Sequence, residues 1–222
     1  MLISHRKQFI FTKTFKTAGT SIESYFEPWC MHEGEWRVRH QRPQYVSEAG
    51  IIGFRGLPVP DDVRWWNHMP AQQIKERIGD AVWDRYFKFC PVRNPFDKMV
   101  SAFFYFCFPN YEQEIRRKNI PVSELFKAWL KQTEHKFDRD KYIIDGRFCL
   151  DAVIRYEHLH EDLKSICRRL DVAYDPSRLP RFKSEFRRAE YSLADLYTPK
   201  SVDIVARMYD YEIERFGYEF PG

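Results

Sequence analysis

Short apolar runs alternate along the chain with segments whose apolar residues recur at helical spacing. Gln8–Thr12, Tyr86–Val92 and Asp151–Tyr156 each form a short, mostly apolar run. Runs of this length, bounded by polar segments, favour buried strands over helices. Because helical segments separate these strands, the pattern predicts a parallel sheet of the α/β class.

Helical periodicity fills the intervals between the strands. The predicted helices are marked by Ile22, Tyr25, Phe26 and Trp29; Ala71, Ile74 and Ile78; Met99, Val100, Phe103, Phe104 and Cys107; Leu125, Phe126, Trp129 and Leu130; Leu159, Leu163, Ile166, Cys167 and Leu170; and Val202, Val205, Tyr209 and Phe216. Pro28 is expected close to the end of the first helix, and Asn94 and Pro95 are typical of a helix start. Gly79 and Gly217 are expected at helix ends. Met31–Met69 shows no clear period, and so long a connection predicts a function or small elements of its own.

Composition adds that the chain can bury a substantial core. Of its 222 residues, 44% are hydrophobic and 17% aromatic, which argues against disorder. This length suits one domain over residues 1–222. The net formal charge is only +4. Such a mild excess favours an anionic ligand, whereas a nucleic-acid partner usually needs a stronger basic bias.

Cysteine usage and hydropathy bear on the compartment. The five cysteines, Cys30, Cys90, Cys107, Cys149 and Cys167, are widely spaced and form no CxxC pair. That pattern predicts reduced thiols in a cytoplasmic protein. No signal peptide is visible, and no stretch approaches the roughly 20 apolar residues of a membrane helix. We therefore expect no membrane span, although an anchor outside this sequence would change that expectation.

The first candidate motif lies between the first strand and its helix. It comprises Phe15, Lys16, Thr17, Ala18, Gly19, Thr20 and Ser21. Free amides and the helix dipole favour anions at such a junction, where Gly19 lets the backbone come close and Lys16 adds a positive charge. Thr17, Thr20 and Ser21 add hydroxyl donors. The Walker pattern is absent, because the lysine precedes the glycine. A plain helix cap with a solvated lysine fits the local chemistry equally well.

The second candidate motif runs from Arg93 to Ser101. Arg93 ends the second strand, at the carboxyl edge of the sheet where ligands usually bind. Ser101 lies two turns into the following helix, so its hydroxyl can face the same side. A guanidinium and a hydroxyl together suit a phosphate monoester. An ion pair of Arg93 with Asp97, and a solvated Ser101, is the alternative that the local sequence leaves open.

The two motifs in this order resemble those of the sulfotransferases that use 3′-phosphoadenosine 5′-phosphosulfate (PAPS), in particular the carbohydrate branch with its uronyl 2-O-type and bacterial relatives. The family's 5′-phosphosulfate loop is like P-K-T-G-G-T-S, which residues 15–21 match with Phe15 for proline and Ala18 for glycine. Its 3′-phosphate motif resembles R-N-P-x-x-R-x-x-S, which residues 93–101 match with Lys98 for the second arginine. By this resemblance, Lys16 to Ser21 with Arg93 and Ser101 would bind the nucleotide.

Two weaker matches extend the resemblance over nearly the whole chain except Met31–Asn67. Residues 155–163 resemble R-x-E-x-L-x-x-D-L, and residues 209–218 resemble Y-x-x-D-x-x-x-F-G-Y. The resemblance implies a three-layer α/β/α fold with a central parallel sheet, similar to P-loop kinases. It also implies PAPS as the sulfuryl donor. We expect no metal, because Lys16 and the helix dipole already neutralise the donor and the motifs contain no acidic cluster.

His68 is the candidate general base among seven histidines (His5, His32, His40, His68, His135, His158 and His160). It precedes the short helix that leads into the strand of Arg93, and the resemblance implies the base at this position. A lone loop histidine is more often a packing or surface residue. His40 is the second candidate, followed by a carboxylate such as Glu48. The segment Arg37–Arg42 around His40 fits a solvated charge run as well as a clamp for an acidic acceptor.

The sequence thus predicts in-line sulfuryl transfer from PAPS to a hydroxyl, with a carbohydrate, acidic ones included, as the expected acceptor. His68 would remove the acceptor proton, while Lys16 and the amides of Gly19 to Ser21 would stabilise the developing charge. A nucleoside or sugar kinase is one rival, and it would need a Walker lysine and a magnesium carboxylate. A non-catalytic phosphate- or glycan-binding protein is the other, and it would not need His68. Acceptor identity, regiochemistry and oligomeric state stay open.

Overall fold

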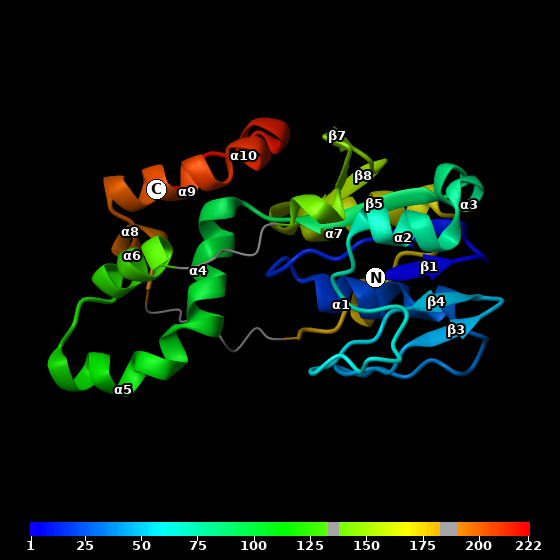
Figure 1. Cartoon of the computed structure of the whole chain (residues 1–222), viewed down its shortest axis with the longest axis horizontal. Coiled ribbons are helices and arrows are strands. Elements are labelled where there is room, and N and C mark those ends of the chain that lie inside the picture. The colour runs from blue at the N-terminus through cyan, green and yellow to red at the C-terminus, as the bar shows by residue number, and fades with distance from the viewer. Residues whose placement is uncertain (133–137, 183–190) are drawn as a thin grey trace. The chain divides into compact units, whose positions relative to one another are not determined.

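The computed structural model describes residues 1–132, 138–182 and 191–222. The chain divides into two compact units (Figure 1). The first contains Met1–Val92 and Phe137–Phe182, and the second contains Arg93–Lys136 and Lys183–Gly222. The assignment of residues 1–222 to one functional domain stays a prediction.

The first unit is built on a six-stranded mixed sheet. Its strands, in spatial order, are β3 (Tyr45–Ser47), β4 (Gly50–Ile52), β1 (Leu2–Ser4), β2 (Phe9–Phe11), β5 (Phe87–Val92) and β8 (Ala152–Arg155). The three predicted strands, β2, β5 and β8, pair in parallel, whereas β3, β4 and β1 add an antiparallel half. A short turn joins β1 to β2, and another joins β3 to β4, which is possible because both pairs are antiparallel. The α/β class is confirmed, and only part of the sheet is parallel.

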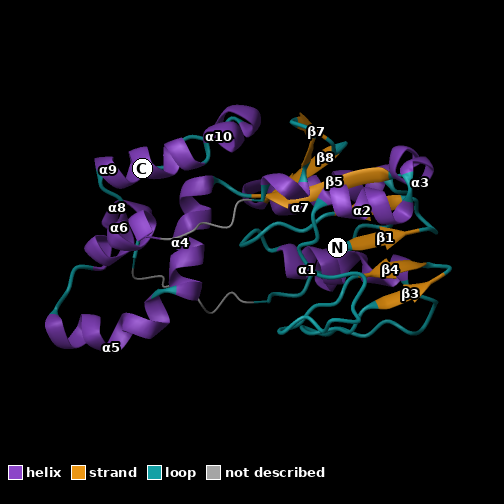
Figure 2. Cartoon of the chain, viewed as in Figure 1, coloured by secondary structure: helices purple, strands orange, loops and turns teal. Residues whose placement is uncertain are grey.

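Helices cover both faces of this sheet and give three layers (Figure 2). Alternation along β2 sends Phe9 and Phe11 to one face and Ile10 to the other. The first face packs on α1 (Gly19–Phe26) and α7 (Leu159–Arg169). The second face packs on α2 (Ala71–Ile78) and α3 (Asp80–Arg85). Each layer of helices therefore has its own apolar core.

Short elements complete the first unit. They are the 3₁₀ turns η1 (Glu27–Cys30), η2 (Arg139–Lys141), η3 (Tyr156–His158) and η4 (Pro176–Arg178), and a separate pair of strands, β6 (Ile143–Ile144) and β7 (Arg147–Phe148). The α-helical part of α1 ends at Phe26, two residues before Pro28, and the chain continues as the 3₁₀ turn η1, which contains Pro28. The aperiodic segment 31–69 does contain small elements, since it includes β3 and β4.

The second unit is helical. Its described helices are α4 (Pro95–Phe106), α5 (Phe108–Lys118), α6 (Val122–Gln132), α8 (Leu193–Leu196), α9 (Pro199–Met208) and α10 (Asp210–Phe216). The predicted start of α4 is confirmed, because the Asn94 side chain accepts a hydrogen bond from the amide of Phe96 at 3.0 Å. The predicted last helix is two helices. It breaks at buried Tyr209, and Gly217 ends α10 with φ at 66°.

All five cysteines are free thiols, and four of them are buried. Across the described ranges, no helix combines the length and the apolar character needed to cross a bilayer.

Candidate functional site

The loop between β2 and α1 has the backbone of an anion-binding turn. Lys16 and Ala18 both have φ at 58°, in the left-handed region. Alternating left- and right-handed residues turn successive amides toward one point. Ala18 caps α1 without a side-chain hydrogen bond, and the first amides of a helix have no acceptor within it. The loop thus presents amides and the positive end of the helix dipole to an anion.

Gly19 is needed here for close packing. A Cβ at this position would lie 2.9 Å from Cγ of Lys13 and 3.3 Å from the carbonyl oxygen of Thr14. The buried stem of Lys13 therefore passes directly against the start of α1. Any larger residue would push the loop away from that stem.

The three predicted hydroxyls lie in different surroundings. Thr17 is buried and shares a 2.9 Å hydrogen bond with the Thr14 hydroxyl. Ser21 accepts a bond from the amide of Phe182 at 3.3 Å. Thr20 is half-buried, and within the described ranges its hydroxyl makes no hydrogen bond. Thr17 and Ser21 thus brace the loop, whereas the Thr20 hydroxyl takes no part in that bracing.

His68 is attached to this loop. Its Nδ1 lies 3.0 Å from the carbonyl oxygen of Lys13, and its ring stacks on Phe15 with centroids 3.8 Å apart and planes 4° from parallel. A carbonyl oxygen only accepts hydrogen bonds, so Nδ1 carries the proton and donates it. The lone pair of the neutral ring is then on Nε2, the atom that would act as a base.

The surroundings of His68 keep its ring neutral. Burial, and after it the positive charge of Lys13, hold the pKa of His68 well below its ordinary value. The hydrogen bond to the Lys13 carbonyl opposes this shift and does not overcome it. A base of this kind is unprotonated throughout the physiological range.

Phe15 makes two contacts that the proline of the family pattern would lack. Its amide donates to both carboxylate oxygens of Asp138, each at 3.1 Å, and Asp138 is buried. Proline has no N–H, so that bond would be absent. Its ring supplies the flat face under His68. Asp138 lies far along the chain, and nothing in the local sequence indicates that it reaches the loop.

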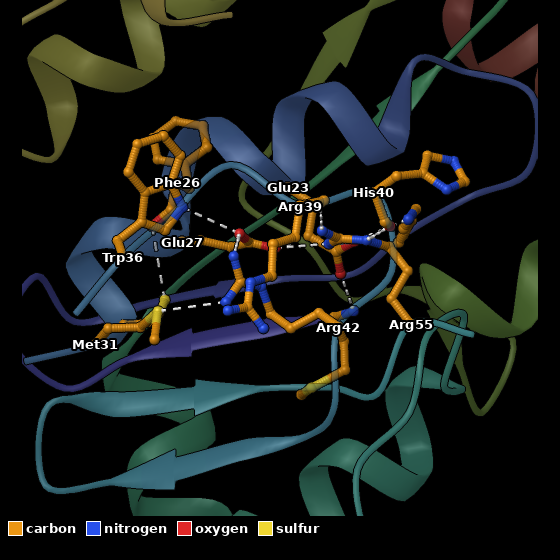
Figure 3. A network of polar contacts seen from close by, with 12 residues as sticks. Glu23, Phe26, Glu27, Met31, Trp36, Arg39, His40, Arg42 and Arg55 are labelled. Atoms are coloured by element: carbon orange, nitrogen blue, oxygen red, sulfur yellow. Dashed lines mark hydrogen bonds and ion pairs between the residues drawn. The ribbon is translucent and has the colours of Figure 1, made fainter. Parts of the chain in front are cut away.

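A buried network of charges surrounds Glu23 and Glu27 (Figure 3). Glu23 and Glu27, both on the α1–η1 segment, have no exposed surface. Glu23 binds the ammonium of Lys13 at 2.8 Å, and Arg55 donates to both carboxylates at 2.6 Å. Arg42 pairs with Glu27 at 2.8 Å. The amino group of Met1 also binds Glu23, at 2.7 Å.

The two carboxylates face four cationic groups, so each carboxylate is held by more than one positive charge. Burial alone would raise the pKa of Glu23, but Lys13, the Met1 amino group and Arg55 hold it well below its ordinary value. The same two carboxylates raise the pKa of Arg55. Such a network fixes geometry, and removal of a carboxylate would leave a buried positive charge without its partner.

Arg55 also holds the basic segment that the sequence singled out. It donates to the carbonyl oxygens of Arg39 and His40, each at 2.7 Å. His40, the second candidate base, is exposed, and its ring contacts Phe182 edge-on. Glu48, the remaining candidate, is exposed in the turn between β3 and β4. The structure thus attaches His68, rather than His40 or Glu48, to the loop between β2 and α1.

The second motif belongs to the second unit. Arg93 and Asp97 form the ion pair considered above, with nitrogen–oxygen distances of 2.6 and 2.7 Å, and it is largely buried instead of on the surface. Ser101 follows Asp97 by four residues, so both lie on one face of α4. Arg93 precedes α4 and is tied to that face through Asp97, and its convergence with the Ser101 hydroxyl stays a prediction. The ammonium of buried Lys98 lies 5.2 Å from the centre of the Tyr209 ring.

No three histidine, cysteine, aspartate or glutamate side chains come together as a metal site in the part of the chain that the structure describes. His135 lies outside that part.

Comparison with known proteins yields one family. The model described as "Sulfotransferase family" matches residues 1–219. An uncharacterized protein from Archaeoglobus fulgidus is 27% identical over 105 residues, which cover 47% of this chain and 83% of that protein. No solved structure matches the chain.

Proposed function

The chain belongs to the sulfotransferase family, and on that premise we propose that it transfers a sulfuryl group from PAPS to a hydroxyl of a carbohydrate. The observation that carries the proposal is the 3.0 Å hydrogen bond between His68 and the Lys13 carbonyl. It attaches a neutral imidazole to the backbone of the loop whose amides suit an anion. A phosphate site and a base are the two parts that this reaction requires.

Each motif, taken by itself, suits one anionic end of the donor. The amides of Gly19 to Ser21, the Thr20 hydroxyl and Lys16 would hold the 5′-phosphosulfate, whose transferable sulfuryl group is the chemistry that PAPS supplies. Arg93 and Ser101 would hold the 3′-phosphate. Support for this assignment is the uncapped start of α1 and the pairing of Arg93 with Asp97, which lies on the same face of α4 as Ser101.

His68 would accept the proton of the attacking hydroxyl at Nε2. Nδ1–H remains bonded to the Lys13 carbonyl, which keeps the ring oriented as its charge changes. The new bond joins the acceptor oxygen to sulfur, and the bond from sulfur to the phosphate oxygen breaks. Lys16 and the loop amides would stabilise the charge that grows on that oxygen.

A carbohydrate acceptor is the finer part of the proposal. It is supported by Arg37 and Arg39, which are exposed on a segment held by Arg55. A segment of this kind suits an acidic sugar chain. Profiling acidic and neutral glycans with labelled PAPS identifies the acceptor. A cytoplasmic location is also proposed, and the five free cysteines support it.

A nucleotide panel separates this function from its rivals. Thermal shifts are measured with 3′,5′-ADP, with 5′-ADP, and with ATP and magnesium. We expect stabilisation by 3′,5′-ADP and transfer of label from PAPS. A preference for ATP with magnesium would indicate a kinase. Binding of 3′,5′-ADP without transfer to any glycan would indicate a binding protein.

The 3′-phosphate assignment has its own variant. Arg93→Ala should weaken 3′,5′-ADP by about tenfold or more, as expected for loss of a charge-assisted bond. Arg117→Ala, an exposed arginine of the same unit, is the matched control. Equal affinity of the wild-type protein for 5′-AMP and 3′,5′-ADP would overturn the assignment.

A further inference from the structure

A pocket of about 410 Å³ lies in the first unit at the opposite end of α1 from the phosphate loop. The eight residues of α1 span about 12 Å, so the pocket and the loop are separate places. Arg6, Lys7, Trp29, Glu33, Trp36 and Arg178 are among the residues that line it. We call it the α1-end pocket. Neither phosphate motif nor any candidate base contributes to it.

Arg178 is the most informative residue of this wall. Its guanidinium lies 4.8 Å from the centre of the Trp29 ring and 5.4 Å from that of Tyr25. In the described part of the chain it pairs with no carboxylate and makes no side-chain hydrogen bond. Stacking fixes the plane of a guanidinium and leaves its forked N–H edge available for a carboxylate or sulfate.

Arg6 and Lys7 add positive charge from the turn between β1 and β2. Arg6 donates to the carbonyl oxygens of Pro28 and Trp29, and Lys7 donates to the carbonyl oxygen of Asp171 at 2.5 Å. The lining carboxylate, Glu33, is 93% exposed and 3.6 Å from Arg6. Asp171, whose carboxylate is 3.4 Å from Lys7, is fully exposed as well. Among the residues that line the pocket, three carry a positive charge and one is a carboxylate, so the lining has a positive balance; the neighbouring carboxylates of Asp171 and Asp175 do not line it.

Two indoles give the pocket an apolar surface. Trp29 and Trp36 are both half-buried. The Nε1 of Trp36 donates to Glu27 at 3.1 Å, which ties this ring to the buried charge network. Rigid aromatic walls with a few directed polar groups are typical of sites for organic ligands, and the volume lies in the usual range for such sites. A free inorganic anion has no apolar surface that could pack on the indoles.

We propose that the α1-end pocket binds an anionic saccharide, a short stretch of a glycan that carries carboxylate or sulfate groups. The apolar faces of its sugar rings would pack on Trp29 and Trp36, and its anionic groups would bind Arg178, Arg6 and Lys7. This goes beyond the transfer reaction, because binding here needs neither the donor nor His68.

The test measures binding of a tetrasaccharide of alternating uronic acid and N-acetylhexosamine by calorimetry, with 3′,5′-ADP saturating. Arg178→Ala should weaken it by about tenfold or more, the usual effect of a lost charge-assisted contact. The control, Arg168→Ala, removes an exposed arginine of α7 outside the pocket and should change the affinity by less than about twofold. Arg178→Lys keeps the charge without the planar fork and should also bind more weakly.

Three further arms identify the ligand. The same tetrasaccharide with its carboxylates reduced to alcohols should bind at least about tenfold more weakly. Inorganic sulfate should not displace the acidic tetrasaccharide at comparable concentration. On binding, the indole N–H resonances of Trp29 and Trp36 should shift, while those of the other four tryptophans stay in place.

Several outcomes would overturn the proposal. They are equal weakening by Arg178→Ala and Arg168→Ala, full affinity of Arg178→Lys, equal binding of the reduced tetrasaccharide, displacement by sulfate alone, or a nucleotide that shifts the same two indoles. The proposed transfer reaction is judged separately. Its failure would appear as absence of label transfer with tetrasaccharide binding retained, whereas failure of the pocket leaves label transfer intact.

Discussion

The two ends of α1 are both suited to anions, by opposite physical means. At the N-terminal end, backbone amides and the positive pole of the helix act directly, and Ala18 adds no side-chain cap. At the other end the pole is negative, and Arg6 occupies the carbonyls of Pro28 and Trp29. An anion there has to be held by cationic side chains such as Arg178. Binding of an anion by backbone amides therefore requires small residues and tight turns. Binding by cationic side chains requires neighbouring groups that stack on those side chains or accept their hydrogen bonds.

The two ends are joined by the carboxylates between them. Glu23 binds Lys13, whose carbonyl holds His68, and Glu27 binds Trp36 in the α1-end pocket. Arg55 bridges both carboxylates. We therefore expect substitutions at either end to act locally, and substitutions in the network to act on both.

The largest effect is expected at the N-terminal end, from His68→Ala. Its rate of sulfuryl transfer should fall by about 10²–10⁴, the usual contribution of a positioned base. The affinity for 3′,5′-ADP should remain nearly intact, because the imidazole would face the acceptor. Steady-state kinetics and calorimetry measure the two quantities. Binding of the acidic tetrasaccharide at the other end of α1 should not change.

His40→Ala is the matched control for that experiment, since His40 is exposed and its backbone carbonyl, not its ring, binds Arg55. If His40→Ala instead loses the rate and His68→Ala retains it, the base is His40. Loss of nucleotide binding together with activity in His68→Ala would make His68 a structural residue.

A substitution in the buried charge network should affect the anion sites at both ends of α1. Glu23→Gln leaves Lys13 and Arg55 buried opposite a neutral amide, which should cost about 3–5 kcal/mol of unfolding free energy. Urea unfolding measures the loss. Donor affinity and tetrasaccharide affinity should both decline.

Glu124→Gln, in an exposed pair with Lys127, is the control and should change stability by less than about 1 kcal/mol. A Glu23→Gln protein as stable as the wild type would mean that the network does not brace the helix. An effect confined to one end would remove the proposed link between them.

Lys16→Ala tests whether the backbone end acts in the transition state. Charge grows on the bridging oxygen as the sulfur–oxygen bond breaks, so kcat should fall by about 10²–10³ and by more than the donor Kd rises. Lys164→Ala, an exposed lysine of α7, is the control. Unchanged turnover in Lys16→Ala would reduce the loop to a helix cap.

Local pattern predicted the elements whose formation depends on local residues. The apolar runs at β2, β5 and β8 and the Asn94 cap of α4 were confirmed because burial and capping are local properties. The antiparallel strands β1, β3 and β4 were missed. They are three residues each, too short for a period, and they exist through pairing with one another and with β2.

Contacts between distant residues were beyond local pattern. The sequence shows only that Phe15 replaces a proline of the family pattern. It does not indicate that the amide of Phe15 binds Asp138 or that its ring stacks on His68. Glu23 and Glu27 lie outside the apolar period that predicted the first helix, and yet both are fully buried. Arg42 and Arg55 supply the charges that make this burial tolerable, and they come from the segment that showed no period. Nor does local pattern indicate that burial and Lys13 hold the pKa of His68 well below the ordinary value of a histidine.

The smallest effect is expected from Phe15→Leu, which keeps apolar volume and the amide bond to Asp138 but removes the flat face under His68. A stacked pair contributes about 0.5–1.5 kcal/mol, so kcat should fall by about 2- to 12-fold. Burial is the leading cause of the low pKa of His68, so looser packing should move that pKa up toward 6.5. The neutral ring is the active form, and the acidic limb of the kcat/KM profile should therefore move to higher pH than in the wild type.

The low pKa of His68 also makes the stability of the folded protein depend on pH. In the wild-type protein the unfolded chain binds the His68 proton near pH 6.5 and the folded chain only well below it, so this contribution to stability is complete above pH 6.5 and is lost as the pH falls toward the folded pKa. Phe15→Leu brings the His68 pKa of the folded protein closer to that of the unfolded chain. The unfolding free energy of this variant should therefore depend less steeply on pH below 6.5. Donor affinity at neutral pH and tetrasaccharide binding at the far end of α1 should stay as in the wild type. An acidic limb that stays in place in Phe15→Leu would show that the ring of Phe15 does not control the ionisation of His68, and a limb that moves to lower pH would contradict burial as the cause.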